Sequence, residues 1–175
     1  DLEDVKTFGI FLDKGDGNSS ESAIIFDSFR IVSIPVIDDF NYYSGQELTA
    51  IGAYSRNQSG NRVVLTPDAA NSSEGRYGVK YEYTMGDGNV GSPNYAGITK
   101  LFGNVDWMGY NGIQFWLKPD DSQNQLTIQF KEKDGEAWEC YYLLSGTEGR
   151  TVTIPITDFN YPGWYSGGSG TNGKI

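Results

Sequence analysis

Short segments in which apolar and polar residues alternate recur along this chain and limit what it can fold into. In GIQFWLKP the apolar side chains Ile113, Phe115 and Leu117 fall at every second position. This period places them on one face of a β-strand, because successive side chains of a strand point to opposite sides. Segments of this kind, separated by clusters of Gly, Asp and Asn, are typical of all-β sandwiches and barrels.

The same alternation predicts further strands at RYGVKYEYTM, LTIQFKEK, AWECYYLL and RTVTIPITDF. The turn KDGE at 133–136 is expected to join the second and third of these as a hairpin. Trp138, Cys140 and Tyr142 then share one face, with Trp138 in the core. Because Pro155 cannot donate a hydrogen bond to a neighbouring strand, its segment is expected at a sheet edge or a bulge.

Length and charge exclude several classes of protein. A chain of 175 residues without an internal repeat is most simply one domain. The formal net charge of −10 argues against a nucleic-acid partner, since phosphate contacts need clustered Lys and Arg. No apolar run resembles a membrane span. Cys140 is the one cysteine, so it forms no intrachain disulfide and no thiolate metal cage, and it is expected to be a buried apolar side chain.

The order of the segments is unusual. FDSFRIVSIPVIDDF, at 26–40, reads as a closing strand followed directly by an opening strand. The chain ends on NGKI and begins on DLEDVKTFGIFL, and the two read across the gap as a turn, a short helical turn and a strand. These features predict that the chain is a circular permutant, in which the original ends were fused near Ile34 and Pro35.

In the rotated order the chain resembles bacterial carbohydrate-binding modules of the β-jelly-roll type, most closely family 11, with families 27 and 35 as more distant relatives. The ordered series DDF, DGExW, TIPxxxF, xDLxxVxxFxI and xxxDxxxI carries this resemblance over nearly the whole chain. It implies an all-β jelly-roll sandwich in circularly permuted order, with 1–34 as the original C-terminal part and 36–175 as the original N-terminal part. A fragment of a tandem array is the alternative explanation.

The resemblance also implies which residues bind sugar. Tyrosines on a concave face stack against pyranose rings, while amides and carboxylates accept hydrogen bonds from hydroxyl groups. The chain departs from the family at FGIFLDK, where Leu12 is nearest to a family tyrosine. Trp116 is either a second platform or packed beneath a loop, and Trp107 is harder to place. The implied sugar-binding residues are Tyr54, Tyr95, Gln129, Lys131, Asp134, Trp164 and Tyr165.

Two aspartates are expected to face apolar surroundings. Strand alternation puts Asp27 on the side of Phe29 in IIFDSFRI, and Asp38 on the side of Phe40 in VIDDF. Two carboxylates buried close together need compensation, which a calcium ion with oxygen ligands would provide. We therefore expect a structural calcium held by Asp27 and Asp38, with Asp39 as a weaker ligand. Bonds from backbone amides, Lys or Arg are the alternative. The segment DKGDGN departs from EF-hand spacing and reads as a turn.

A catalytic alternative comes from EKDGE. Its Glu132, Asp134 and Glu136 have the E-x-D-x-E spacing of jelly-roll lichenases. The intervening residues of that motif are apolar, whereas here they are Lys133 and Gly135, and KDG reads as a turn that would splay the three acids. A hydrolase is therefore the weaker interpretation.

The sequence thus predicts a secreted, non-catalytic module that binds β-glucan chains, β-1,4 or mixed β-1,3-1,4, and keeps an attached glycosidase near plant cell-wall polysaccharide. Mannan or another β-1,4-glycan is the alternative ligand. A calcium-stabilised adhesion or scaffold domain is the alternative from another class. We expect no nucleic-acid or membrane partner, and a monomer, or an oligomer if the permutation was engineered.

Overall fold

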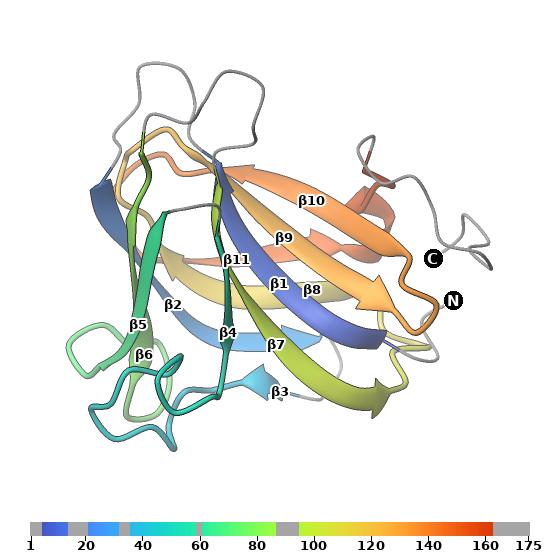
Figure 1. Ribbon diagram of the computed structural model, residues 1–175, viewed down its shortest axis with the longest axis horizontal. Coiled ribbons are helices and arrows are strands. Elements are labelled where there is room, and N and C mark those ends of the chain that lie inside the picture. The colour runs from blue at the N-terminus through green and yellow to red at the C-terminus, as the bar shows by residue number, and fades with distance from the viewer. Residues whose placement is uncertain (1–4, 14–20, 32–35, 59–60, 87–94, 163–175) are drawn as a thin grey trace.

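Strands account for most of the structure, which is a computed structural model describing residues 5–13, 21–31, 36–58, 61–86 and 95–162. The strands form two antiparallel sheets that pack face to face as a sandwich (Figure 1). In this view β10, β9, β1 and β7 cross in front of β11, β8 and β2. The all-β sandwich expected from the alternating pattern is confirmed, and it is consistent with a jelly roll.

Sheet A, the nearer sheet in Figure 1, has the strand order β10-β9-β1-β7-β4. Its central strand β1 pairs with β9 on one side and β7 on the other. The strands are β1 (Val5–Asp13), β4 (Ser55–Gln58), β7 (Tyr95–Val105), β9 (Gln125–Glu132) and β10 (Ala137–Leu143).

Sheet B has the order β11-β8-β2-β6-β5, with β3 paired to β2 off this path. The strand β11, which ends at Pro155, lies at the sheet edge as its proline predicts. The elements are β2 (Glu21–Ile31), β3 (Val36–Asp38), β5 (Arg62–Asp68), β6 (Gly78–Thr84), β8 (Gly112–Lys118), β11 (Arg150–Pro155) and the 3-10 helix η2 (Ile156–Asp158).

The core fills the space between the two sheets. Phe8 of β1 meets Phe29 of β2 edge to face, with ring centroids 5.3 Å apart, and Phe29 stacks on Phe115 of β8 at 4.9 Å. Burying such a ring stabilises the fold by about 1.5–3 kcal/mol relative to exposing it. The strand periodicity therefore fixes which face of each sheet turns inward.

Several local predictions are confirmed. The β9–β10 hairpin forms around the expected turn, with Trp138 opposite Phe130 in the register. Trp138 is 6% exposed and belongs to the core as predicted. Trp107, which the sequence leaves unplaced, is 1% exposed in the same core, and Cys140 is only partly buried against it. Burial raises the pKa of the Cys140 thiol, which keeps it protonated.

The alternation in β2 breaks at a β-bulge, which corrects the prediction for Asp27. Pairing with β8 shifts register between Asp27 and Arg30, and Ser28 has a φ of 53°. Phe26 faces the core before the bulge and Phe29 faces it after. Asp27 therefore does not share the side of Phe29. It lies opposite Trp116 and is fully buried.

The junction of the predicted permutation lies where β2 and β3 meet. These strands are antiparallel neighbours, with Phe29 opposite Asp38 and Arg30 opposite Val36. Ile34 and Pro35 themselves lie outside the described residues. The closing and opening strands are thus side by side, which is the arrangement a fusion of original termini requires.

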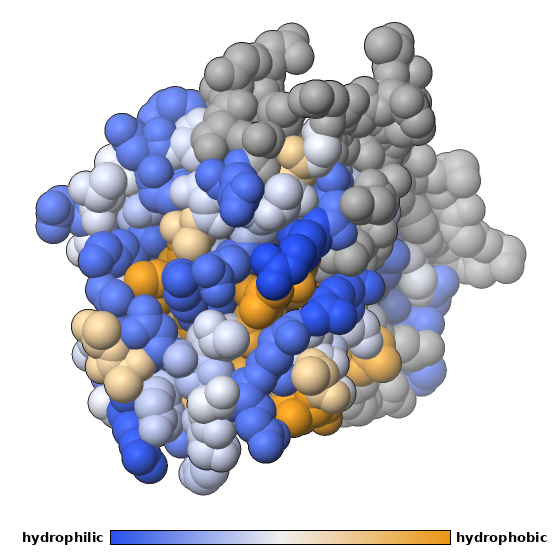
Figure 2. Space-filling model, turned by 60° about the vertical axis from the view of Figure 1, so that its left-hand side comes forward, coloured by the Kyte–Doolittle hydropathy of each residue, from blue (hydrophilic) through white to orange (hydrophobic). Residues whose placement is uncertain are grey.

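The described surface in Figure 2 shows small apolar patches separated by polar side chains. Across the ranges that the structure describes, there is no helix with the length and apolarity needed to cross a membrane.

Candidate functional site: the outer face of sheet A

Sheet A turns one face away from the core, and we call it the outer face. Four rows of side chains cross it from β10 through β9 and β1 to β7. The rows are Leu143, Gln125, Asp13 and Tyr95; then Tyr141, Thr127, Phe11 and Gly97; then Glu139, Gln129, Gly9 and Thr99; then Ala137, Lys131, Thr7 and Leu101.

At the centre of the outer face Phe11 lies against two glycines. A Cβ built on Gly9 would come within 2.6 Å of the Phe11 ring, and one built on Gly97 within 2.2 Å. No other residue type therefore fits at either position unless the ring moves. The ring also meets Tyr95 edge to face, with centroids 6.0 Å apart. The two glycines thus let an aromatic ring rest close to the backbone of the sheet.

On the β10 side, a hydrogen-bonded group surrounds Glu139. Gln129 donates from Nε2 to Glu139 Oε1 at 2.6 Å, and the Tyr141 hydroxyl donates to Oε2 at 2.8 Å. Glu139 is 4% exposed, whereas Tyr141 is 49% exposed. Burial, and then the bond to the Glu139 carboxylate, raise the pKa of Tyr141 to about 12. Tyr141 therefore stays neutral and presents an exposed ring whose hydroxyl is fixed.

A second carboxylate, Asp13, lies on β1 in the row next to that of Phe11 and Thr127. Thr127 donates from its hydroxyl to Asp13 Oδ2 at 2.9 Å. Burial raises the pKa of Asp13, the Thr127 bond opposes this, and the negative charge of Glu139 adds to the rise. The outer face thus combines aromatic rings, carboxylates and amides, which is the set of groups that recognises sugar hydroxyls and ring faces.

The structure brings three of the predicted sugar-binding residues onto this face. Tyr95, Gln129 and Lys131 come from β7 and β9 and lie in three of its rows. Asp134 is exposed in the turn beyond the end of β9, so it lies at the margin of the face. Trp164 and Tyr165 lie outside the described residues.

Tyr54 has another position, which corrects the expectation of a stacking platform. Its side chain is 4% exposed, its ring packs on Phe40 with centroids 6.5 Å apart, and its hydroxyl donates to Asp38 at 2.9 Å. A ring covered in this way leaves no free surface for a pyranose unit. Tyr54 is a core residue because the buried carboxylate of Asp38 takes up its hydroxyl group.

Leu12, which the sequence puts nearest to a family tyrosine, does not lie on the outer face of β1. Leu12 is fully buried and faces the core, whereas Phe11, one residue earlier, lies on the outer face. The chain therefore has an aromatic ring on the outer face of this strand.

Sequence reasoning missed Phe11, Asp13, Glu139 and Tyr141. The signal was present, because alternation in FGIFLDK puts Phe11 and Asp13 on the side opposite the apolar residues. The same alternation in AWECYYLL puts Glu139 and Tyr141 opposite Trp138. The core-facing residues Trp138, Cys140 and Tyr142 define the inward face of that segment, and the opposite face is therefore the outward one.

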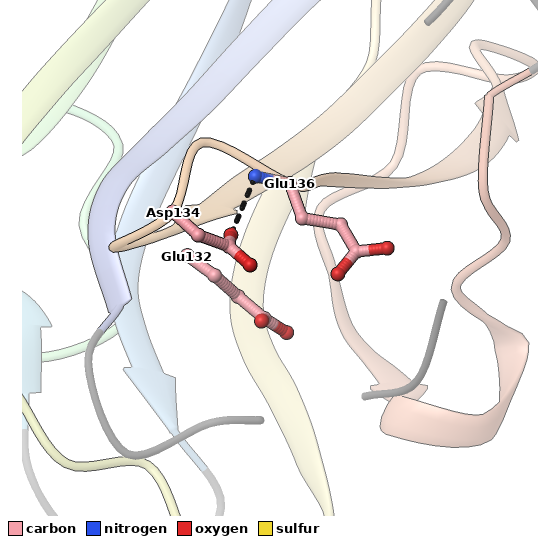
Figure 3. A group of neighbouring side chains, drawn as sticks. All are labelled: Glu132, Asp134 and Glu136. Atoms are coloured by element: carbon pink, nitrogen blue, oxygen red, sulfur yellow. Dashed lines mark hydrogen bonds between the residues drawn. The ribbon is translucent and has the colours of Figure 1, made fainter. Parts of the chain in front are cut away.

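The three acids of the β9–β10 turn lie closer than expected. Figure 3 shows their arrangement around the turn, where the Glu136 backbone N–H donates to Asp134 Oδ1 at 2.9 Å. One carboxylate oxygen from each of Glu132, Asp134 and Glu136 lies within 4.8 Å of the others. The turn is confirmed, but the prediction that it splays the acids apart is wrong, since the turn folds their side chains together.

These acids do not form an open catalytic pair. Glu132 and Glu136 are 3% and 0% exposed, so the described structure leaves neither open to a glycosidic bond. Burial raises the pKa of Glu132, and the negative charges of Glu136 and Asp134 contribute to the rise. Their chemistry is that of a compact acidic turn at the end of the hairpin.

The carboxylate of Asp38 is surrounded by hydrogen-bond donors. Tyr43 and Tyr54 donate their hydroxyls to Oδ2 at 2.9 Å each, and the Phe40 backbone N–H donates to Oδ1 at 2.9 Å. The Lys100 ammonium also contacts Oδ2 and forms an ion pair. Neighbouring Asp39 accepts one bond, from the Asn41 backbone N–H at 3.1 Å.

Asp27 is surrounded in a similar way, but by a loop. The Ser73 and Glu74 backbone N–H groups and the Ser73 hydroxyl all donate to its Oδ2. The donors around Asp27 and Asp38 compensate for their charges without a metal ion, and a calcium ion would have to displace them. These residues, as arranged here, do not fit a calcium site.

Comparison with known proteins gives a family. The model of the family described as "Carbohydrate binding domain (family 11)" matches residues 32–169. A mannan endo-1,4-beta-mannosidase from Bifidobacterium adolescentis is 24% identical over 125 residues, which are 70% of this chain and 12% of that enzyme. The chain therefore spans only a small part of that relative's length. No solved structure matches the chain.

The matched span begins after β2 ends at Ile31, so β1 and β2 lie outside it. These two strands are central in their sheets: β1 lies between β9 and β7, and β2 lies between β8 and β6. Without them, each sheet would separate into two parts. The segment preceding the matched span thus completes both sheets.

Proposed function

We propose, on the premise that this chain belongs to family 11 of the carbohydrate-binding domains, that the outer face of sheet A binds β-glucan chains with β-1,4 or mixed β-1,3-1,4 linkages. The family is non-catalytic, so the partner is a polysaccharide that is bound and not cleaved. The observation that carries the proposal is the combination of Tyr95, Phe11 and Tyr141 with the buried Glu139 and Gln129 on one sheet face.

Affinity is expected to be modest, about −4 to −8 kcal/mol, which spans millimolar to micromolar dissociation constants. Stacking and hydrogen bonds to a flexible chain must first offset the entropy lost when that chain is ordered. Such an affinity suits a module that holds an attached glycoside hydrolase near plant cell-wall polysaccharide outside the cell.

Affinity electrophoresis tests the proposal. Gels with barley β-glucan, hydroxyethylcellulose, mannan or xylan are compared with a gel that lacks polysaccharide. Retardation in the β-glucan and hydroxyethylcellulose gels is expected, and Tyr95→Ala and Trp164→Ala should reduce it. A parent protein that runs unretarded in all four polysaccharide gels would contradict the proposal.

Mannan is a second candidate ligand. It is favoured by one observation, that the relative with 24% identity is a mannan endo-1,4-beta-mannosidase. The same gels separate the two ligands: retardation in mannan alone would replace β-glucan by mannan as the ligand of the outer face.

The circularly permuted order is also a proposal. It is supported by the adjacency of β2 and β3 and by the central places of β1 and β2, which precede the matched span. A variant that opens the chain between Ile34 and Pro35 and joins Ile175 to Asp1 should fold with the same stability. Its failure to fold would favour the tandem-array alternative.

Calcium binding stays a proposal, which is based on the two buried aspartates and which the donors around Asp27 and Asp38 do not support. If a calcium ion is structural, the chelator EDTA lowers Tm by several degrees and added calcium restores it. An unchanged Tm would contradict a structural ion and would agree with the compensation of Asp27 and Asp38 by hydrogen bonds.

A further inference from the structure

We infer that Tyr141 is a stacking residue for the glycan, and that Tyr141 and Phe11 contact pyranose units one disaccharide apart on a chain that lies across the strands of sheet A. This inference rests on the proposed function, because it specifies how the outer face holds the chain.

Tyr141 is pre-organised for stacking. Its ring is 49% exposed, while its hydroxyl is bonded to Glu139, which Gln129 holds from the other side. A tyrosine fixed at its hydroxyl loses little side-chain freedom when a sugar ring docks on it. Glu139 and Gln129 are therefore positioning residues, since they act through the ring of Tyr141.

The spacing of the two rings sets the direction of the chain. Tyr141, Thr127 and Phe11 are consecutive in one row, on β10, β9 and β1. Neighbouring strands are 4.7–4.9 Å apart, so Tyr141 and Phe11 start from backbone positions ~10 Å apart. This separation matches the length of one disaccharide in a β-1,4-linked chain, in which every second unit presents the same face.

Phe11 offers less exposed ring surface to the glycan than Tyr141 does. It is 9% exposed and rests against Gly9 and Gly97, so its ring stays close to the sheet. Tyr95 meets the Phe11 ring edge to face and continues the aromatic series onto β7. A chain crossing from β10 to β7 therefore meets aromatic rings on three strands, with carboxylates and amides of the neighbouring rows beside it.

The path predicts a dependence on chain length. A disaccharide covers one ring at a time, whereas a tetrasaccharide reaches both Tyr141 and Phe11. The parent should therefore bind a tetrasaccharide much more tightly than a disaccharide, and removal of Tyr141 should abolish most of this gain.

The experiment is isothermal titration calorimetry with cellobiose and cellotetraose, or with mannobiose and mannotetraose if mannan is the polysaccharide that retards the parent. Tyr141→Ala should weaken tetrasaccharide binding ~10-fold, the loss expected for one aromatic contact. Tyr141→Phe keeps the ring but not the hydroxyl bond and should lose only ~3-fold. Phe11→Leu, which keeps apolar volume in case Phe11→Ala does not fold, should lose ~5-fold.

Tyr42→Ala is the matched control, because Tyr42 is an exposed tyrosine, 92% accessible, outside sheet A. It should leave affinity unchanged. If the parent binds and Tyr141→Ala keeps both its affinity and its gain from disaccharide to tetrasaccharide, this inference is overturned and the proposed function stands. If the parent binds no glycan, the proposed function fails and the inference fails with it.

Discussion

The outer faces of the two sheets each carry an aromatic side chain against a glycine, yet they differ in what surrounds it. On sheet A, Phe11 rests on Gly9 and Gly97, which belong to strands of the same sheet. On sheet B, Trp116 lies against Gly149, whose Cβ would come within 2.1 Å of the indole ring and which belongs to the connection before β11.

A second connection covers the residue opposite Trp116 in the register. Asp27, its cross-strand neighbour, is fully buried because Ser73 and Glu74 of the segment between β5 and β6 donate to its carboxylate. Lys118 anchors the same segment through a bond to Asn71 Oδ1 at 2.9 Å. Trp116 is therefore packed against Gly149 and stays partly exposed, next to a carboxylate that the segment between β5 and β6 covers.

The comparison shows that outward alternation is not enough to make a binding face. On the proposed function, the backbone around an outward aromatic residue decides whether its ring is open to a ligand or packs against a loop. The first three predictions test this division, since changes on sheet B should affect stability and changes at the Phe11 ring on sheet A should affect glycan affinity; the fourth concerns the charge of Asp13.

The largest effect is expected for Asp27→Ala. The substitution leaves the Ser73 and Glu74 N–H groups without their acceptor and should lower the free energy of unfolding by about 3 kcal/mol. Urea unfolding measures this loss. Glycan affinity measured below the transition should not change. Asp39→Ala, which removes a single bond at a half-buried site, is the control and should cost about 1 kcal/mol.

Trp116→Ala should lower the free energy of unfolding by about 2 kcal/mol, less than a fully buried tryptophan because its side chain is partly exposed. Urea unfolding measures this loss, and glycan affinity is measured below the transition. A loss of glycan affinity at unchanged stability would contradict the comparison, because it would make Trp116 a sugar platform on sheet B.

Gly97→Ala should act mainly on binding. The new Cβ displaces the Phe11 ring and should weaken glycan binding ~5-fold, with a loss of about 1 kcal/mol in stability. Gly86→Ala is the matched control, because the nearest atom to its Cβ is Asn61 Oδ1 at 3.9 Å. Equal affinities of the two variants would show that the position of the Phe11 ring is unimportant.

The smallest effect is expected for Asp13→Asn and depends on pH. Burial raises the pKa of Asp13 above its ordinary value of 3.8, and the charge of Glu139 adds to this. The stabilisation that this one carboxyl contributes is therefore fully present below pH 3.8 and is lost as pH rises through its folded-state pKa. Asp13→Asn should therefore be more stable than the parent at pH 7, with the difference vanishing near pH 3. Thermal unfolding across this range checks the sign.

The sequence predicts strands and core well because both depend on local periodicity. Ile113, Phe115 and Leu117 are buried as their alternation predicts, and the hairpin forms at its Asp-Gly turn. The bulge at Ser28 escaped prediction, because a positive φ at a serine has no local sequence signal comparable to a glycine. This one shift moved Asp27 from the predicted core side to the loop side.

The candidate site was predicted in part. Gln129, Lys131 and Tyr95, which the resemblance implies, lie on the outer face of sheet A. The burial of Tyr54 depends on Asp38, 16 positions away, and on Lys100 of another strand, and such long-range contacts cannot be read from periodicity. The resemblance also did not point to Tyr141, whose inferred stacking role depends on the hydrogen bond that fixes its hydroxyl on Glu139.

The most direct test of the outer face as the binding surface is NMR chemical-shift mapping. The ligand is cellotetraose, or mannotetraose if mannan is the polysaccharide that retards the parent. The account predicts that the largest shifts fall on backbone amides of Phe11, Thr127 and Tyr141, in one row of sheet A. Largest shifts at Gln114 and Trp116 of sheet B, with sheet A unchanged, would contradict it.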